Sequence, residues 1–226
     1  MVSLSAAEAA AVLGVSQRQV TRLARAGELE IVGDVGGHLL LDSISVHRRA
    51  RAGPRRGRPL TAAGAWAALM VLSGEGVEQV VDSPTLSRLR SRLRRSTAEE
   101  VAWMVRRRSV GTVRVQGWGD TAGLIPTGVS AISDVRWSVA FGLSVVPIDG
   151  FDGYVAEQDY AETARRLGLV EDREGRYSLR LVPVGARWKV DRVLVAAIAV
   201  DLMESTGTRE AAAGRDVLTG LLAQDF

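Results

Sequence analysis

Arginine supplies most of the side chains in this sequence that could do chemistry. Of the 29 basic residues among 226, one is Lys189 and the other 28 are arginines. Guanidinium groups bind phosphate oxygens and the acceptor atoms on base edges, so their distribution along the chain is informative. Residues 1–108 hold 17 arginines against 10 acidic residues, a net charge of +7. Residues 109–226 hold 12 basic residues against 16 acidic ones, a net charge of −4. This asymmetry predicts nucleic-acid binding in the first half of the chain and a different role in the second.

The other chemically capable residues do not form a catalytic or metal-binding set. The sequence has no cysteine, which excludes disulfides, thiol nucleophiles and zinc fingers. His38 and His47 lack metal-ligand spacing, and the loop Gly117–Gly123 is one residue too long for a dinucleotide-binding loop. Asp149 and Asp152 each precede a glycine, which indicates turns. No nucleophile, base and orienting group can be assigned together, so we expect no enzyme activity, metal or cofactor.

Two short helices and a tight turn position the first group of arginines. Ser5 and Glu8 have the spacing of a capping box, which opens a helix over about 6–12. Gly14 allows a turn, and Ser16 caps a second helix that runs to about Ala26. The 3.6-residue period places Val20, Leu23 and Ala24 on one face of this second helix. The polar side chains outside that face, with the cap, are the predicted DNA contacts: Ser16, Gln17, Arg18, Thr21, Arg22 and Arg25.

A hairpin and a third helix complete a recognisable outline. Strands are predicted over Glu30–Gly33 and His38–Leu41, on either side of a turn at Asp34–Gly37. Asp42 caps a helix over about 43–50. Helix, three-residue turn, helix, hairpin and helix make the outline of a winged helix-turn-helix, whose second helix enters the major groove.

The stretch from Ser5 to Leu29, with Asp42 opening the next helix, resembles the excisionase and MerR-type winged helix families. The resemblance implies a DNA-binding domain over residues 1–52. In those families the hairpin tip usually carries an arginine, whereas here the tip is Val35–His38, so we expect no such phosphate contact from it. The alternative is a small helical domain that contacts protein.

Residues 53–59 follow as a basic tether, because two prolines and two glycines cannot continue a helix. Its Arg-Gly-Arg-Pro sequence at 56–59 matches the AT-hook, in which an extended Arg-Gly-Arg lies in the narrow minor groove of A·T sequence. This interpretation makes Arg55, Arg56 and Arg58 further DNA contacts. A solvated linker is the alternative.

Residues 60–108 are predicted to be helical and rich in arginine. An apolar helix spans Leu60–Leu72, Ser83 caps a second helix, and Ser96 caps a third. Residues 88–108 hold eight arginines against two acidic residues. Arginines near a helix C-terminus interact favourably with the helix dipole, and a second phosphate-contacting surface is the other interpretation.

Residues 109–226 are predicted to form an acidic α+β domain. Strands are expected over Val110–Gln116 and within Gly128–Val146, and a hairpin pairs Leu169-Val170 with Tyr177–Val182. Helices are expected over about 159–167, Val190–Met203 and 208–223. Four tryptophans are assigned to the core rather than to a base-stacking surface: Trp103, Trp118, Trp137 and Trp188.

The second half, with the arginine-rich helices before it, resembles the AbiEi-type antitoxin and regulator group of actinobacterial toxin–antitoxin loci. Four stretches carry this resemblance: Gly150–Val155, Arg176–Pro183, Ala199–Ser205 and Ala213–Leu218. It implies an N-terminal winged helix that represses its own operon. It also implies a C-terminal domain that counters a partner toxin with a nucleotidyltransferase-like fold.

The sequence therefore predicts an α+β protein with a winged helix-turn-helix, an arginine-rich helical middle and a mixed α/β C-terminal domain. The expected function is that of a sequence-specific transcriptional regulator that binds double-stranded DNA, as an autorepressing antitoxin with a toxin partner or a second subunit. The alternatives are an excisionase-like or architectural factor acting with an integrase, a partner-independent repressor and a protein-interaction module. No apolar run reaches the roughly 18 residues of a membrane span, so we expect a cytoplasmic, nucleoid-associated protein.

Overall fold

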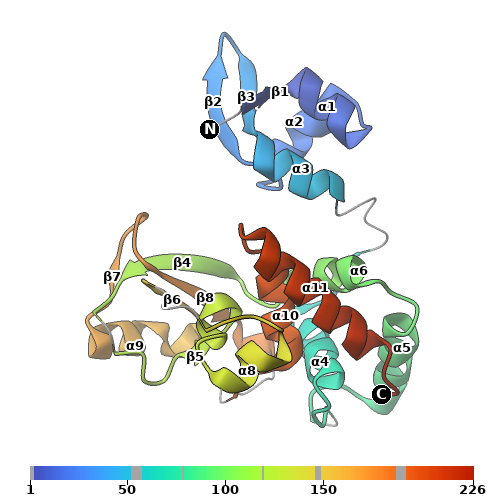
Figure 1. The fold of residues 1–226 in the computed structure, drawn as a ribbon, viewed down its shortest axis with the longest axis vertical. Helices are drawn as coiled ribbons and strands as arrows, with labels where there is room; N and C mark the ends of the chain where they lie inside the picture. The colour runs from blue at the N-terminus through green and yellow to red at the C-terminus, as the bar shows by residue number, and fades with distance from the viewer. Residues whose placement is uncertain (1–2, 52–57, 78, 119, 146–148, 187–191) are drawn as a thin grey trace. The chain divides into compact units, whose positions relative to one another are not determined.

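A computed structural model describes residues 3–51, 58–77, 79–118, 120–145, 149–186 and 192–226. The chain folds into two compact units, Met1–Arg56 and Gly57–Phe226, here called the N-terminal and C-terminal units. Figure 1 shows the elements of both. None of the described helices is long and apolar enough to cross a membrane.

In the described residues 3–51, the N-terminal unit holds three helices and a three-stranded antiparallel sheet with strand order β1-β3-β2. Its helices are α1 (Ala6–Leu13), α2 (Gln17–Arg25) and α3 (Ser43–Arg51). Its strands are β1 (Ser3–Ser5), β2 (Ile31–Val35) and β3 (His38–Asp42). The helix-turn-helix prediction is confirmed, and β1, which no sequence signal indicated, pairs with β3 at the sheet edge.

Local capping explains why these helices begin where they do. The Ser5 and Glu8 side chains each bond the other residue's backbone N–H, so the predicted capping box forms. The Ser16 hydroxyl accepts from Gln19 N (3.3 Å), and the Asp42 carboxylate accepts from Ser45 N (2.7 Å). The helices then enclose a small core of their own: Ala9, Ala10, Val20, Leu23, Ala24, Leu29, Leu41 and Val46.

The C-terminal unit combines helices with a five-stranded mixed sheet of order β5-β6-β8-β4-β7. Its helices are α4 (Ala62–Leu72), α5 (Ser83–Leu93), α6 (Ala98–Met104), α7 (Gly128–Ala131), α8 (Val135–Ala140), α9 (Tyr160–Leu167), α10 (Val195–Met203) and α11 (Thr208–Leu222), with 3₁₀ turns at Glu157–Asp159 and Val184–Ala186. Its strands are β4 (Gly111–Gln116), β5 (Ile125–Pro126), β6 (Phe151–Ala156), β7 (Val170–Glu171) and β8 (Tyr177–Val182). Helices α4, α5 and α6 gather at one side of the unit and α9 at the other (Figure 1).

Two predicted helix caps were wrong by one residue. Helix α5 is capped by Asp82, whose carboxylate accepts from Thr85 N (2.8 Å), rather than by Ser83. Helix α6 is capped by Thr97, which forms a reciprocal capping box with Glu100. Ser96 instead donates its hydroxyl proton to Arg92 O (2.8 Å) and so belongs to the end of α5. In each case the adjacent residue, whose side chain is an equally good N-cap, forms the cap instead.

The predicted hairpin between Leu169-Val170 and Tyr177–Val182 was also wrong. Strand β4 lies between β7 and β8, while β8 pairs with β4 antiparallel and with β6 parallel. Gly175 makes this insertion possible, because a Cβ atom there would lie 2.4 Å from the carbonyl carbon of Val115 on β4.

The segment Gly128–Val146, expected to contain strand, instead forms α7 and α8 in its described part. Asp134 starts α8 by accepting a hydrogen bond from Arg136 N (2.8 Å). Asp152, expected in a turn, lies within β6. Among the tryptophans assigned to the core, Trp118 is 68% exposed, Trp103 and Trp137 are half-buried, and Trp188 lies outside the described residues.

One core spans residues on both sides of position 108. Trp66, Leu93 and Met104 from the helical region pack in the same cluster as Ile198 and Leu218 from the C-terminal helices. A second cluster, around Val115, Val155, Tyr177 and Leu179, lies between the sheet and α9. The two regions that sequence analysis separates at residue 108 therefore fold together.

Candidate DNA-contacting surface

Helix α2 divides cleanly into a buried and an exposed face. Val20, Leu23 and Ala24 are at most 7% exposed and belong to the core of the N-terminal unit. On the other side, Gln17, Arg18, Arg22 and Arg25 are exposed, and Thr21 is half-buried. The predicted split of this helix is therefore the observed one.

The exposed side chains of α2 border a hollow in the surface of the N-terminal unit. It is lined by Ser16, Arg18, Gln19, Thr21, Arg22 and Arg25. Arg18, Arg22 and Arg25 are four and three residues apart, so they lie along one side of the helix. None of these three guanidinium groups has an ion-pair partner among the described residues. The surface therefore carries uncompensated positive charge beside amide and hydroxyl groups, which suits phosphates and base edges.

Two of the predicted contact residues also serve the helix itself. Ser16 caps α2 through its hydroxyl oxygen, and the Thr21 hydroxyl donates to Gln17 O (3.1 Å). Gln19, which was not among the predicted contacts, also lines the hollow. Gln19 lies three residues, about one helical turn, before Arg22, and this spacing could have indicated it.

The β2–β3 hairpin ends in an apolar tip. Gly36 and Gly37 have positive φ, and the Asp34 carboxylate accepts from Gly37 N (2.9 Å) to close the turn. Val35 beside them is 64% exposed. The tip therefore presents an exposed aliphatic side chain.

The structure describes only the end of the predicted tether. Arg55 and Arg56 lie outside the described residues, whereas Arg58 is exposed and belongs to the C-terminal unit. The Arg58 carbonyl accepts a hydrogen bond from Arg92 Nη2 on α5 (3.4 Å).

Arg108 is the last of the eight arginines within residues 88–108. It is buried in the C-terminal unit and cannot face a partner. Only 3% of its side chain is exposed, and Nη2 pairs with Asp201 Oδ1 (2.5 Å) and Glu204 Oε1 (2.8 Å). Tyr154 donates to Asp201 Oδ2 (2.7 Å), as does Thr127 (2.5 Å). Burial alone would raise the pKa of Asp201, but Arg108 and Arg180 hold that pKa below its ordinary value.

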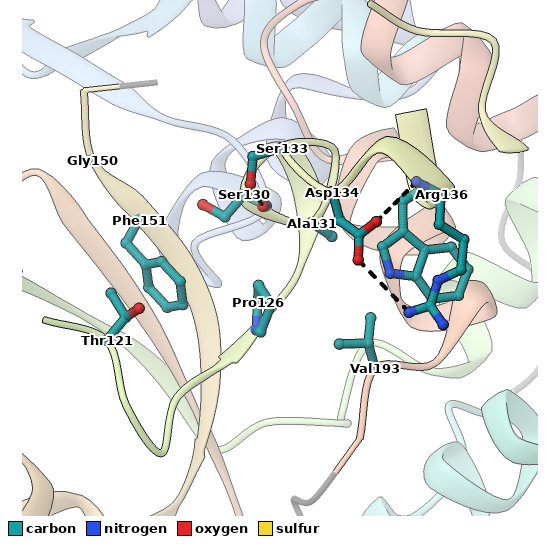
Figure 2. Close-up of a pocket in the computed structure, with 11 residues that line it drawn as sticks. Thr121, Pro126, Ser130, Ala131, Ser133, Asp134, Arg136, Gly150, Phe151 and Val193 are labelled. Atoms are coloured by element: carbon teal, nitrogen blue, oxygen red, sulfur yellow. Dashed lines mark hydrogen bonds and ion pairs between the residues drawn. The ribbon is translucent and has the colours of Figure 1, made fainter. Parts of the chain in front are cut away.

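A second hollow, of about 320 Å³, lies beside α7 and α8 in the C-terminal unit (Figure 2). Its two serine hydroxyls are engaged with backbone: Ser130 accepts from Asp152 N (2.7 Å) and Ser133 donates to Ser130 O (2.7 Å). The Arg136 guanidinium lies over the Trp137 ring, 4.3 Å from its centroid. The described residues here supply a cation and an apolar floor, without a nucleophile beside a base.

The described part of the chain contains no group of three or more His, Cys, Asp or Glu residues that could hold a metal ion. His38 is the first residue of β3, and His47 lies within α3. Asp149 forms an exposed ion pair with Arg176 (2.5 Å).

Comparison with known families assigns the N-terminal unit. Residues 3–53 match the family model described as a helix-turn-helix domain. This range contains α1, α2, the hairpin and α3. No curated protein and no solved structure matches the chain.

Proposed function

We propose that the chain is a sequence-specific, double-stranded DNA-binding transcriptional regulator that reads its site with α2. The observation that carries the proposal is the two-sided character of α2 within the matched helix-turn-helix range. The apolar side of α2 is buried in the core of the N-terminal unit. Its polar side presents three arginines without ion-pair partners among the described residues. A second helix of this kind places its N-terminal residues against base edges in the major groove.

The residues then take distinct roles. Gln17 and Arg18, in the first turn of α2, reach base edges, since amide and guanidinium groups can each make two hydrogen bonds to one base. Arg22 and Arg25, nearer the other end, bind phosphate or base. Ser16 and Thr21, with their hydroxyls tied to the helix backbone, contact phosphates. The β2–β3 hairpin acts as a wing whose Val35 contacts the sugar backbone.

Removing an arginine from this face should weaken specific binding. Arg18→Ala and Arg22→Ala should each cost about 1–3 kcal/mol, roughly 5- to 150-fold in Kd, if each guanidinium reads a base. The helical circular dichroism signal should stay unchanged, because both side chains are exposed. The measurement is fluorescence anisotropy at fixed salt, on a site selected from a random-sequence duplex library with the full chain.

The matched control is Arg173→Ala, which removes the same charge from an exposed turn of the C-terminal unit. It should leave the Kd within about twofold. If Arg18→Ala and Arg22→Ala bind as tightly as this control, α2 is not the recognition helix.

The proposal includes the finer role of an autorepressing antitoxin, located on the nucleoid in the cytoplasm. Its support is the resemblance of Gly150–Val155 and the other three stretches to AbiEi-type regulators, and the acidic balance of residues 109–226. The C-terminal unit would then bind a toxin with a nucleotidyltransferase-like fold, or a second copy of the chain. Co-purification with the product of the adjacent gene tests the partner, and a promoter–reporter fusion tests repression.

A second candidate is an excisionase-like or architectural factor that acts with an integrase. The helix-turn-helix match is compatible with it, and so is the minor-groove interpretation of the tether. Such a factor bends its site, so a FRET-labelled duplex should shorten its end-to-end distance on binding. An unbent complex favours the repressor.

The tether prediction rests on the sequence of residues 56–59. If Arg56-Gly57-Arg58 lies in a minor groove, the Arg56→Ala/Arg58→Ala variant should lose more affinity for an A·T-flanked site than for a G·C-flanked one. Gly57→Val should act similarly without changing any charge, because a side chain there holds the backbone off the groove floor. Equal losses on both sites, with Gly57→Val inert, identify a simple linker.

A further inference from the structure

Helix α5 is unusually basic for its length. The segment from Ser83 to Arg95 contains no acidic residue and five arginines: Arg88, Arg90, Arg92, Arg94 and Arg95. No ion pair involving any of the five occurs among the described residues. By contrast, other arginines of the unit pair with carboxylates, for example Arg192 with Glu75 (2.7 Å) and Arg215 with Glu99 (2.7 Å).

Packing divides these five arginines into two groups. Leu86, Leu89 and Leu93 are buried in the core and fix which side of α5 faces inward. Arg90 is half-buried beside this stripe, and the Arg94 guanidinium binds Phe226, donating to its carbonyl oxygen (2.5 Å) and lying 5.7 Å from its ring centroid.

The remaining three, Arg88, Arg92 and Arg95, are four and three residues apart and lie away from the leucines. Arg88 and Arg95 are exposed, and each uses Nε to bond a backbone carbonyl four residues earlier (3.2 and 3.0 Å). These bonds hold the side chains along the helix while their terminal Nη groups carry no hydrogen bond to the described residues. We call this set the α5 arginine face.

The helix dipole accounts for Arg92, in the last turn of α5, but not for Arg88. The dipole favours cations only within the last turn of a helix. Arg88 lies in the middle of α5, which spans Ser83–Leu93. Three cations on one side also repel one another, so the charges of this set do not stabilise the isolated unit through their mutual interaction.

The first described residues after α3 contact α5 and α6. Arg92 holds the backbone of Arg58 (3.4 Å), and Leu60 N donates to Met104 O at the end of α6 (2.9 Å). The chain therefore enters the C-terminal unit at α5 and α6. Only residues 52–57 separate α3 from this entry point, and a fully extended chain from Arg51 to Arg58 spans at most about 25 Å.

We propose that the α5 arginine face binds phosphates of the double-stranded DNA that flanks the site read by α2. The inference rests on the proposed function, and it adds a sequence-independent contact from the second unit. Duplex DNA fits the face because it supplies closely spaced phosphates along a rigid backbone. Neutralising a phosphate releases counterions. Each arginine–phosphate contact should therefore add about 0.9 to the slope of log Kd against log salt.

The test uses the full chain and the selected site in two duplexes, one limited to the core site and one extended by about a helical turn on each side. In the variant Arg88→Gln/Arg92→Gln/Arg95→Gln, the salt slope on the long duplex should fall by about 2–3. At about 0.1 M salt the Kd should rise about 10- to 100-fold, while the ratio of specific to non-specific affinity on the long duplex stays within about threefold. On the short duplex the variant should match the wild type.

Two control variants separate a local DNA contact from a change in net charge and from loss of the Arg92–Arg58 hydrogen bond. The variant Arg165→Gln/Arg173→Gln/Arg209→Gln removes the same charge from exposed positions elsewhere in the unit and should leave the slope unchanged. Arg88→Gln/Arg95→Gln spares the Arg92–Arg58 contact and should still lower the slope by about 1–2.

The outcomes separate the two proposals. If both α5 variants keep the wild-type slope while Arg18→Ala still loses the site, the α5 face does not touch DNA and the proposed function stands. Equal loss in the α5 and control triples also overturns the inference, since it shows only a net-charge effect. If the wild type selects no site, the proposed function fails, and the inference about α5 fails with it.

Discussion

The Asp201→Asn variant is expected to lower the free energy of unfolding of the C-terminal unit by about 3–5 kcal/mol. This carboxylate is fully enclosed and holds two guanidinium groups, Arg108 (2.5 Å) and Arg180 (3.2 Å). Replacing it with an amide removes the charge and leaves both cations in a buried site, where the half-exposed Glu204 pairs with both and Asp152 interacts with Arg180. Chemical denaturation followed by near-UV circular dichroism measures the change.

An exposed ion pair in the same unit supplies the control. Asp149 and Arg176 are joined at 2.5 Å, but their side chains are 82% and 46% exposed. Asp149→Asn should therefore cost at most about 1 kcal/mol. Equal losses in the two variants would show that burial of the Asp201 cluster adds nothing to the stability.

The same variant makes a prediction about pH. The pKa of Asp201 is lowered in the folded state by its two arginines, so its stabilisation is present above the ordinary carboxyl pKa of about 3.9 and is lost as pH falls. The stability gap between wild type and Asp201→Asn should be constant from pH 7 to 5 and should narrow below about pH 4. Burial raises the pKa of Asp152 and the nearby Asp201 carboxylate raises it further, so the opposing contribution of Asp152 is smaller in the Asp201→Asn variant than in the wild type. A gap that widens on acidification would contradict the assignment.

The N-terminal unit could be predicted from sequence because its determinants are local. Ser5, Ser16 and Asp42 each cap a helix through a residue three positions later, and Gly14 takes the positive φ that ends α1. The period of Val20, Leu23 and Ala24 then sets which side of α2 is exposed. The candidate surface follows from these rules. The hydrogen bond between Thr21 and the Gln17 carbonyl was not anticipated, although it also spans only one turn.

The C-terminal unit resisted prediction because its determinants are distant in sequence. Arg108 stands in an Arg-Arg-Arg run that looks like a solvated helix end, yet its partners Tyr154 and Asp201 lie 46 and 93 residues later. Nothing near Arg108 signals that choice. Likewise, Asp172–Gly175 has the composition of a hairpin turn, and only the passage of β4 past Gly175 separates the flanking strands.

Trp66→Ala is the second variant with a large expected effect, a loss of about 3–5 kcal/mol. Trp66 on α4 is fully buried, and its indole Nε1 donates to Arg108 O (2.8 Å). Its ring meets the Tyr154 ring edge to face, with centroids 5.1 Å apart. Truncation therefore opens a cavity beside the Asp201 cluster and also removes the donor to Arg108 O. Trp66→Phe, which keeps most of the ring volume, should recover about half of the loss.

Trp118→Ala is the matched control, because this side chain is 68% exposed and should cost no more than about 0.5 kcal/mol. Trp66→Ala also tests where the folding unit ends. If residues 60–108 and 109–226 share one core, Trp66→Ala must lower the unfolding midpoints of the helices and of the sheet together, since Trp66 and Tyr154 of β6 are in contact. Hydrogen exchange resolved by segment can follow α5 and β8 separately. A shift confined to residues 60–108 would restore the boundary at 108, and a joint shift that spares α2 establishes the two units of the chain.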